Sequence, residues 1–208
     1  MKYSASELVK RSSMQLVYLR EKNMRILTKM MANGTAYQSH VVKDESLANI
    51  VAEEMRGCYT YDDNQIFFCI DMIKNGDFYE IKSVLNKSGE DADEYDEWYL
   101  NSSLLQCAFY KSLILRMDSD ILFTPKFRVK EGYKKTYLKI DKNANYYLKF
   151  GKIGEYKVDV TDPDKLIDFY KNKINSLTDY YSAKNFDIEF KHKEFGLLEK
   201  YFTWEKIQ

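Results

Sequence analysis

The alternation of apolar and polar positions divides the chain into helical and extended stretches. In residues 6–32 and 36–55, apolar side chains recur mostly at three- and four-residue intervals, which predicts two helices. From residue 59 to residue 85 the period shortens, and two aromatic and β-branched runs, IFFCIDMI and DFYEIKSVL, flank Asn75-Gly76. An Asn-Gly pair between two such runs predicts a β-hairpin closed by a two-residue turn.

The second half of the chain repeats this change of period. A helix is predicted from about residue 95 to residue 117, after the acidic segment 90–97, whose charge suits a helix N-terminus. Residues 121–160 alternate aromatic or aliphatic with polar side chains, which predicts several strands. Thr161-Asp162-Pro163 predicts an N-cap with proline at the first helical position, followed by a helix to about residue 181. The run FDIEFKH, residues 186–192, is expected to form a last strand.

This order of elements predicts an α/β or α+β protein that forms a single domain over residues 1–208. Within it we expect N-terminal helices in residues 1–56 and a hairpin followed by a helix in residues 57–118. Residues 119–208 are expected to form a basic, strand-rich region with a C-terminal helix. Apolar residues make up 45% of the chain and charged residues 31%, which is enough to build a sizeable core.

Charge and cysteine content bear on the partners of the protein and on the compartment in which it is found. The 32 basic and 32 acidic residues balance, so net charge indicates no partner. Cys58, Cys69 and Cys107 cannot all pair within one chain and do not have metal-ligand spacing, which favours a reducing compartment without zinc or an iron–sulfur cluster. No signal peptide and no apolar run of about 20 residues is apparent, so we expect a cytoplasmic protein (host cytoplasm if viral) with no membrane partner.

The predicted hairpin brings acidic side chains together. A two-residue turn at Asn75-Gly76 places Asp71 directly opposite Glu80, with Cβ atoms about 4.5–5.5 Å apart, and Lys82 projects from the same face. Two carboxylates at this range repel by about 4 kcal/mol at an effective dielectric of about 20. A hard divalent cation would offset that repulsion, so the pattern predicts a Mg²⁺ or Mn²⁺ site. The other face is expected to be a core-facing set of Phe68, Ile70, Met72, Tyr79 and Ile81.

Asp71 and the triplet Glu80-Ile81-Lys82 resemble the core signature of the PD-(D/E)XK nuclease superfamily. The helix that follows carries Gln106-Cys107-Ala108-Phe109-Tyr110, which is similar to the Gln-x-x-x-Tyr motif of the RecB-like branch. That branch includes CRISPR-associated RecB-like nucleases and lambda-type exonucleases. The resemblance implies a restriction-endonuclease-like core, in which a mixed central sheet is flanked by helices.

The resemblance also implies metal-dependent hydrolysis of DNA phosphodiester bonds. In that scheme Asp71, Glu80 and the carbonyl of Ile81 bind one or two Mg²⁺ or Mn²⁺ ions. Such an ion lowers the pKa of a bound water, which then attacks phosphorus. Lys82 orients this water and offsets charge in the transition state.

Two residues of the following helix and one of a preceding helix complete the implied site. Gln106 and Tyr110 lie four apart on one helix face and are expected to position the scissile strand. The family often places a histidine ligand on the helix before the hairpin. Its usual spacing from a glycine falls on Gln38, whereas the histidine nearby is His40. His40 is preferred because imidazole is a better metal ligand than a carboxamide. Alternatively, an acid at position 53 or 54 fills this place.

A basic region follows the implied site. From residue 126 to residue 157 there are 10 basic and 3 acidic residues, with tyrosines among them. Basic side chains neutralise phosphates and aromatic rings stack on bases. The residues expected to bind DNA are Lys126, Arg128, Lys130, Tyr133, Lys134 and Lys135. A solvated sheet face with tyrosines in the core would give the same pattern.

The expected function is therefore a Mg²⁺- or Mn²⁺-dependent deoxyribonuclease. An exonuclease is favoured over an endonuclease, because relatives of this branch commonly process DNA ends in recombination, repair or phage DNA metabolism. Its partners would be DNA and either further copies of the chain or a recombination or helicase protein. The alternative is a catalytically inactive nucleic-acid-binding or interaction protein of the same fold.

Overall fold

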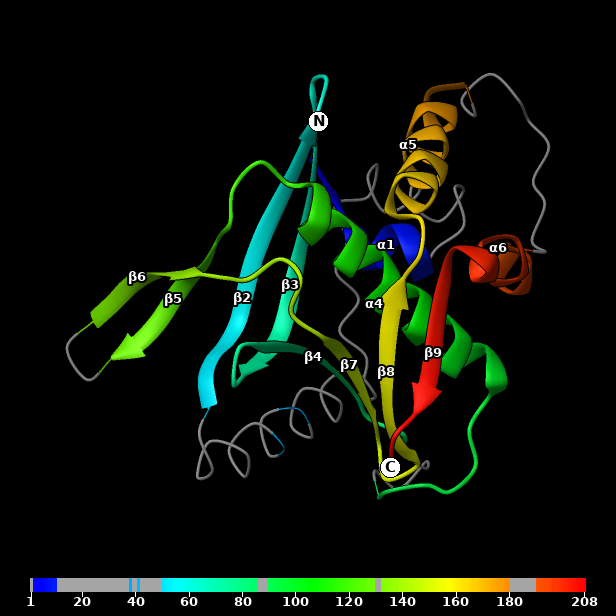
Figure 1. Cartoon of the computed structure of the whole chain (residues 1–208), viewed down its shortest axis with the longest axis horizontal. Helices are drawn as coiled ribbons and strands as arrows, with labels where there is room; N and C mark the ends of the chain where they lie inside the picture. The colour runs from blue at the N-terminus through cyan, green and yellow to red at the C-terminus, as the bar shows by residue number, and fades with distance from the viewer. Residues whose placement is uncertain are drawn as a thin grey trace.

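A single mixed sheet forms the centre of the molecule (Figure 1). The computed structural model describes residues 2–10, 38, 41, 50–85, 90–129, 132–179 and 190–208. In chain order the elements are β1 (Lys2–Ser4), α1 (Ala5–Lys10), β2 (Ile50–Tyr61), β3 (Asn64–Lys74), β4 (Asp77–Lys82), α4 (Glu97–Arg116), β5 (Ile121–Val129), β6 (Gly132–Lys139), β7 (Tyr146–Phe150), β8 (Gly154–Val160), α5 (Pro163–Asp179), α6 (Phe190–Leu198), the 3₁₀ helix η1 (Glu199–Tyr201) and β9 (Phe202–Lys206).

The strands are ordered β6-β5-β2-β3-β4-β7-β8-β9, and β1 pairs with β3 beside this path. Neighbouring strands are antiparallel except for two parallel pairs, β1–β3 and β4–β7. Helix α4 contacts β2, β7 and β8 on one side and α1, α5 and α6 on the other. The expected mixed α/β class is confirmed.

The hairpin turn forms as its sequence predicts. Asn75 and Gly76 have φ values of 54° and 89°, the left-handed conformation that a two-residue hairpin turn requires. The flanking residues Lys74 and Asp77 are Cα partners, so the turn sets the register of β3 against β4.

The two strands separate soon after the turn. Their ladder ends at the pair formed by Met72 and Tyr79, and β4 continues as a parallel neighbour of β7, where Glu80 pairs with Leu148. Asp71 and Glu80 are therefore not cross-strand partners, which corrects the sequence-based expectation. The register is the predicted one, but the β3–β4 ladder stops at Met72 and Tyr79, whereas β4 stays paired with β7 from Phe78 to Lys82, and Asp71 lies just beyond the last β3–β4 pair.

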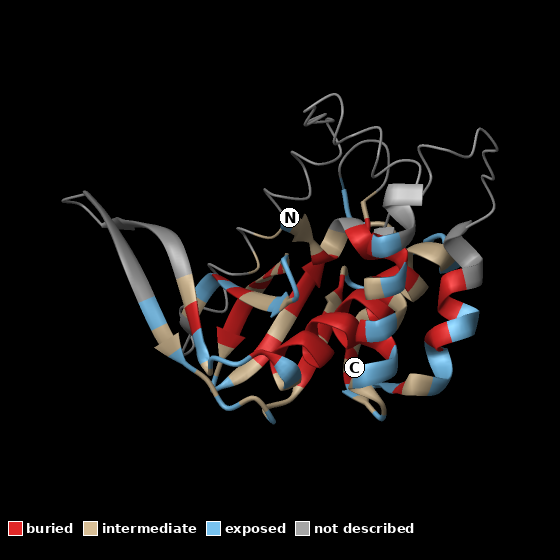
Figure 2. Ribbon diagram, turned by 90° about the horizontal axis from the view of Figure 1, so that it is seen from above, coloured by how far each residue is buried: buried red, intermediate tan, exposed pale blue. Residues whose placement is uncertain are grey.

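Helix α4 is the most buried helix among the described elements. It starts at the predicted position, with the Asp96 carboxylate accepting a hydrogen bond from the Trp98 N–H at 3.0 Å. Every residue from 102 to 114 is buried, including polar side chains. Figure 2 shows the buried residues following α4 and the central strands. Polar groups on this helix consequently face the core, where they need partners.

The N-terminal elements differ from the two predicted helices. The first helix is seen as α1, and residues 11–32 lie outside the described residues. Gln38 and Val41 are helical, but Ile50 already begins β2, so the expected helix is wrong over residues 50–55. The helix-forming types at 52–55 are overridden because β2 pairs with the eleven-residue strand β3 along its length.

The C-terminal elements are confirmed in part. Helix α5 begins at Pro163, and the Asp162 carboxylate accepts a hydrogen bond from the Lys165 N–H at 3.1 Å, as expected for an N-cap. The strand expected over residues 186–192 is wrong from Phe190 onward, where α6 begins; residues 186–189 lie outside the described residues. The sheet instead ends with β9, which the sequence interpretation did not predict.

The apolar side chains of the hairpin divide between two clusters instead of forming one set. Phe68 and Ile70 belong to the main core, whereas Met72 and Ile81 form a second cluster with Val41 and Tyr79 packed against it. The prediction that these residues form a single core-facing set is therefore wrong. No helix in the described parts of the chain is long and apolar enough to span a membrane.

Candidate active site

Asp71 occupies the point where β3 and β4 separate. Its Oδ2 accepts a hydrogen bond from the Ile81 backbone N–H at 2.8 Å, and its Oδ1 accepts one from the Gln38 side-chain amide at 2.9 Å. The first bond takes the place of strand pairing and holds Asp71 beside the Glu80-Ile81-Lys82 triplet. The second joins the carboxylate to a residue 33 positions earlier in the chain.

Glu80, Lys82 and Gln106 form a buried polar group beside Asp71, with relative exposures of 2%, 9% and 2%. The Lys82 ammonium donates to Glu80 Oε1 in an ion pair, and Gln106 Nε2 donates to the same oxygen at 2.6 Å. Glu80 Oε2 and Gln106 Oε1 are buried and accept no hydrogen bond from the described residues. Two acceptor oxygens without donors are costly in a core.

Two carboxylates, Asp71 and Glu80, act on the Lys82 ammonium. Burial alone would lower the pKa of Lys82, but the Glu80 and Asp71 carboxylates outweigh it and raise that pKa above its usual range. The Lys82 ammonium is paired with Glu80, and the Asp71 carboxylate adds to the rise of its pKa. Burial also raises the pKa of Cys69 to about 12, with Asp71 adding to the effect and Arg56 opposing it.

Tyr110 lies next to these groups and is buried. Burial raises its pKa well above the usual range, Glu80 and Asp71 add to this, and a hydrogen bond with the Ser6 side chain opposes it. Its ring lies 5.7 Å from that of Phe68, measured between centroids. The Phe68 ring fits because position 57 is glycine: a Cβ there would lie 2.1 Å from the ring.

Two further tyrosines near the site were not predicted. Burial raises the pKa of Tyr99, with Lys82 opposing and Glu80 adding to the shift. Tyr99 is seven residues before Gln106, two helical turns along the same face, and this spacing could have revealed it. The hydroxyl of Tyr146 on β7 is buried without a hydrogen-bond partner among the described residues, and Glu80 adds to the burial that raises its pKa. No local pattern pointed to Tyr146, because it reaches the site through the β4–β7 pairing.

The donor set at this site consists of oxygens that suit a hard cation. Asp71 and Glu80 are carboxylates, and the orphaned Glu80 Oε2 and Gln106 Oε1 are the buried acceptors that a Mg²⁺ or Mn²⁺ ion would satisfy. Across the residues that the structure describes, no group of three or more His, Cys, Asp or Glu side chains could hold a metal. Among the described residues, an ion at this site would therefore have at most two carboxylate ligands, and its other ligands would be backbone oxygen or water.

The preceding helix contributes Gln38 to the site. His40, the preferred ligand in the sequence interpretation, lies outside the described residues. Glu53 and Glu54, the acidic alternatives, are exposed residues of β2 instead of belonging to a helix. Glu54 has a φ of 48°, so the strand is irregular at the residue that faces Asp71 in the register.

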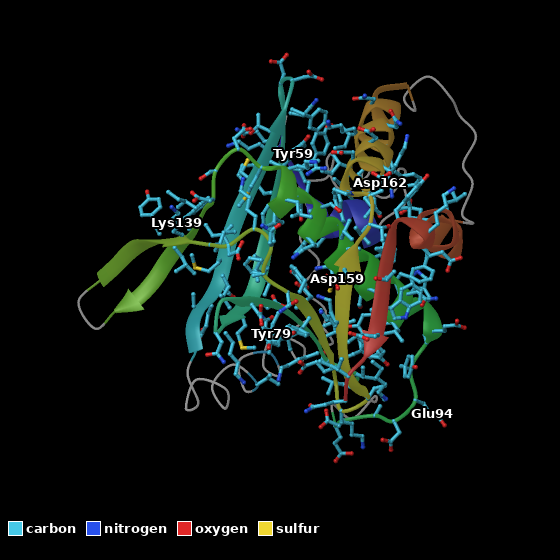
Figure 3. All side chains as sticks on the ribbon, viewed as in Figure 1. Tyr59, Tyr79, Glu94, Lys139, Asp159 and Asp162 are labelled. Carbon is cyan, nitrogen blue, oxygen red and sulfur yellow. The ribbon has the colours of Figure 1, made fainter. Side chains whose placement is uncertain are left out.

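The residues expected to bind DNA fall on a strand pair at one end of the sheet. Lys126 and Arg128 belong to β5, whereas Tyr133, Lys134 and Lys135 belong to β6; Lys130 lies outside the described residues. Figure 3 shows Lys139 on this pair and Tyr79 on β4, well separated. The expected basic region is thus divided by the fold.

Further along the basic region, Lys149 on β7 and Lys157 on β8 form ion pairs with Glu155 and Asp159, at 3.5 Å and 3.7 Å. Lys152, between these strands, pairs with Asp93 at 2.9 Å, and Lys139 on β6 pairs with Asp120 at 3.4 Å. The sequences of β5 and β6 contain basic residues and no acidic residue.

Comparison with models of protein families, with curated proteins and with solved structures finds no match to this chain. The function must accordingly be argued from the geometry and chemistry of the site itself.

Proposed function

We propose that this protein is a metal-dependent deoxyribonuclease with a variant of the restriction-endonuclease-like core. The observation that carries the proposal is the buried group of Glu80, Lys82 and Gln106 beside the half-buried Asp71, in which Glu80 Oε2 and Gln106 Oε1 accept no hydrogen bond from the described residues. A core arranged for stability alone would neutralise these charges and pair these oxygens. An arrangement that awaits a cation would leave them as they are.

Asp71 and Glu80 would hold one or two Mg²⁺ or Mn²⁺ ions, with the Ile81 carbonyl as a further ligand. When bound, the ion supplies a water of lowered pKa and Lewis-acid stabilisation of phosphate oxygens. His40 stays a predicted ligand.

The other residues of the site orient these groups. The Ile81 N–H and Gln38 each bond one oxygen of Asp71, which fixes the plane of that carboxylate. The Lys82 ammonium is paired with Glu80, and from there it would orient the attacking water and offset charge on phosphorus.

Gln106 and Tyr110 are proposed to position the site instead of contacting the scissile strand directly. Gln106 is bonded to Glu80 and Tyr110 to Ser6, and both are buried. Gln106 would hold Glu80 in place, and Tyr110 would keep α1 and α4 together beside it. Lys126, Arg128, Lys130, Tyr133, Lys134 and Lys135 are proposed to contact DNA.

A second candidate function is binding of nucleic acid without cleavage. The ion pair of Lys82 with Glu80 supports it, because this pair already occupies one carboxylate oxygen that an ion would need. Binding of the ion would have to loosen that pair.

The test is degradation of labelled linear and closed circular DNA with Mg²⁺ or Mn²⁺, by the wild-type chain and by Lys82→Ala. Metal-dependent loss of the linear DNA that disappears in Lys82→Ala is the expected result, and sparing of the circle would assign an exonuclease. Binding of DNA by both proteins with no cleavage under any of these conditions would select the second candidate.

A further inference from the structure

We propose that the strand pair β5–β6, together with Arg56, forms a groove-binding arm that holds the duplex part of a DNA substrate and directs it to the site at Asp71. The inference rests on the proposed nuclease function for its biological meaning. Its evidence is separate: the pairing of the strands, the distribution of charge and the position of Arg56.

The β5–β6 arm extends beyond the sheet. β5 is joined to β2 through the pair formed by Phe123 and Arg56, whereas β5 and β6 pair with each other from Ile121–Lys139 to Val129–Gly132. The β5–β6 register shifts between Thr124 and Phe127. Beyond this shift neither strand has another neighbour among the described strands, and Figure 1 shows both extending away from β2. About six residues per strand give a ribbon of about 20 Å.

Positive charge is concentrated on this arm and is carried by both of its strands. Between residues 121 and 139 there are 6 basic residues and 1 acidic residue. Lys126 and Arg128 lie on β5, and Lys134 and Lys135 lie on β6. This excess is unlike the balanced pairs on β7 and β8. A polyanion is therefore the partner that the arm complements.

Arg56 links the arm to the candidate site. It is exposed, and its Cα partners are Phe123 on β5 and Cys69 on β3, two residues before Asp71. The sign of charge changes along β2 at this point, because Glu53 pairs with Met72, next to Asp71, and Arg56 pairs with Cys69, two residues before Asp71. A phosphate backbone reaching from the arm to the acidic site would meet Arg56 on the way.

The arrangement favours a duplex over a single strand. A two-stranded ribbon fits the major groove of B-DNA, which is about 12 Å wide. Both strands of the ribbon carry basic residues, which matches the two phosphate backbones that line the groove of a duplex, whereas a single strand offers one line of phosphates. The substrate class inferred is consequently double-stranded DNA flanking the position that is cut.

The experiment measures binding without metal, so that cleavage does not enter. Fluorescence anisotropy in EDTA is recorded for a labelled blunt duplex of about 30 base pairs and for one of its strands, over a series of salt concentrations. The full chain is compared with Arg56→Ala and with the fourfold variant Lys126→Ala, Arg128→Ala, Lys134→Ala, Lys135→Ala. The matched control is Lys165→Ala with Lys200→Ala, two exposed lysines on α5 and η1. Circular dichroism and thermal melting verify that each variant is folded.

We expect the fourfold variant to weaken duplex binding at least about tenfold and to lower the salt slope by about 3 to 4. Arg56→Ala should weaken it about threefold to tenfold, and the control should bind as wild type. Equal losses for the duplex and the single strand, or no loss in the fourfold variant, would overturn the inference. Failure of the proposed function looks different: the variants would lose duplex binding as expected, while the wild-type chain would cut no DNA in Mg²⁺ or Mn²⁺.

Discussion

The described parts of the molecule contain two buried lysine–glutamate pairs, and they differ in what surrounds them. Lys82 and Glu80 belong to one strand, β4, at the point where the sheet divides. Lys173 and Glu194 join α5 to α6 with a separation of 2.5 Å between Nζ and Oε1. The side chains of both pairs are nearly inaccessible to solvent.

In the helical pair, Lys173 and Glu194, the two charges balance each other. The Lys173 ammonium also donates to the Leu8 carbonyl at 2.7 Å, so it ties α1 to the other two helices. Burial lowers the pKa of Lys173 and raises that of Glu194, and each partner only partly offsets this. One cation, one anion and one carbonyl leave no excess charge.

The strand pair has an excess of negative charge and unpaired oxygens. Asp71 adds a second carboxylate, the pKa of Lys82 is raised instead of lowered, and Glu80 Oε2 has no donor among the described residues. Burial of a lysine with a glutamate therefore does not identify a site. The second acid and the unpaired oxygen do, because stability gives no reason for either.

The largest expected difference between the pairs is in hydrolysis. Lys82→Met removes a positioned charge and should lower the rate on linear DNA by on the order of 10² to 10³. Lys173→Met lies outside the site and should leave the rate per folded molecule unchanged. Single-turnover rates on the folded fraction of each variant measure this contrast, and similar losses in both variants would remove the distinction drawn between the pairs.

Substitution of Lys173 in the helical pair should lower the stability of the protein, although it leaves the rate of hydrolysis unchanged. Lys173→Met leaves Glu194 buried without its cation and should lower the free energy of unfolding by about 3–5 kcal/mol. The double variant Lys173→Met with Glu194→Leu should regain most of this loss, since an apolar pair of similar volume can replace a buried ion pair. Urea unfolding measures both, and a double variant no more stable than the single one would argue against the pair as the cause.

Substitution of Gln38 should weaken binding of the metal ion more than it lowers the stability of the fold. Because its amide orients Asp71, Gln38→Ala should weaken Mn²⁺ binding by about 10- to 100-fold, the range typical of groups that orient a ligand. Calorimetric titration with Mn²⁺ measures the affinity. Unchanged affinity would mean that the Gln38–Asp71 hydrogen bond has no part in holding the ion.

The smallest expected effect is the dependence of the free energy of unfolding on pH. Burial raises the folded-state pKa of Glu194, so the folded chain holds this proton to higher pH than the unfolded chain does. Stability due to Glu194 is therefore lost as pH rises from about 4.3 through the folded pKa. The free energy of unfolding of the wild type minus that of Glu194→Gln should fall over this window and then level off. A difference that rises with pH would contradict the assignment.

Local sequence signals predicted the parts of the site that depend on neighbours in the chain. Asn75-Gly76 set the hairpin register, because both residues accept positive φ. Helical spacing placed Gln106 and Tyr110 on a common face of α4. The class of protein followed from the change of hydrophobic period along the chain.

Long-range pairing determined what the sequence could not reveal. The β3–β4 ladder ends at Met72 and Tyr79, while Glu80 stays paired with Leu148 of β7, over 60 residues later, so the prediction that Asp71 pairs directly with Glu80 was wrong. The sequence of residues 50–55 predicts a helix, and its pairing with β3 in the folded chain makes it a strand. The contact of Gln38 with Asp71 likewise depends on the folded chain, and its spacing alone did not separate it from His40.

The central claim is that the negative excess at Asp71 and Glu80 exists to hold a divalent cation. Its most direct test is Mn²⁺ binding followed by electron paramagnetic resonance, with the wild-type chain, Asp71→Asn and Glu194→Gln side by side. The account predicts bound Mn²⁺ in the wild type and in Glu194→Gln, and loss of the bound signal in Asp71→Asn. Retention of the bound signal in Asp71→Asn, or no binding by the wild type, would contradict it.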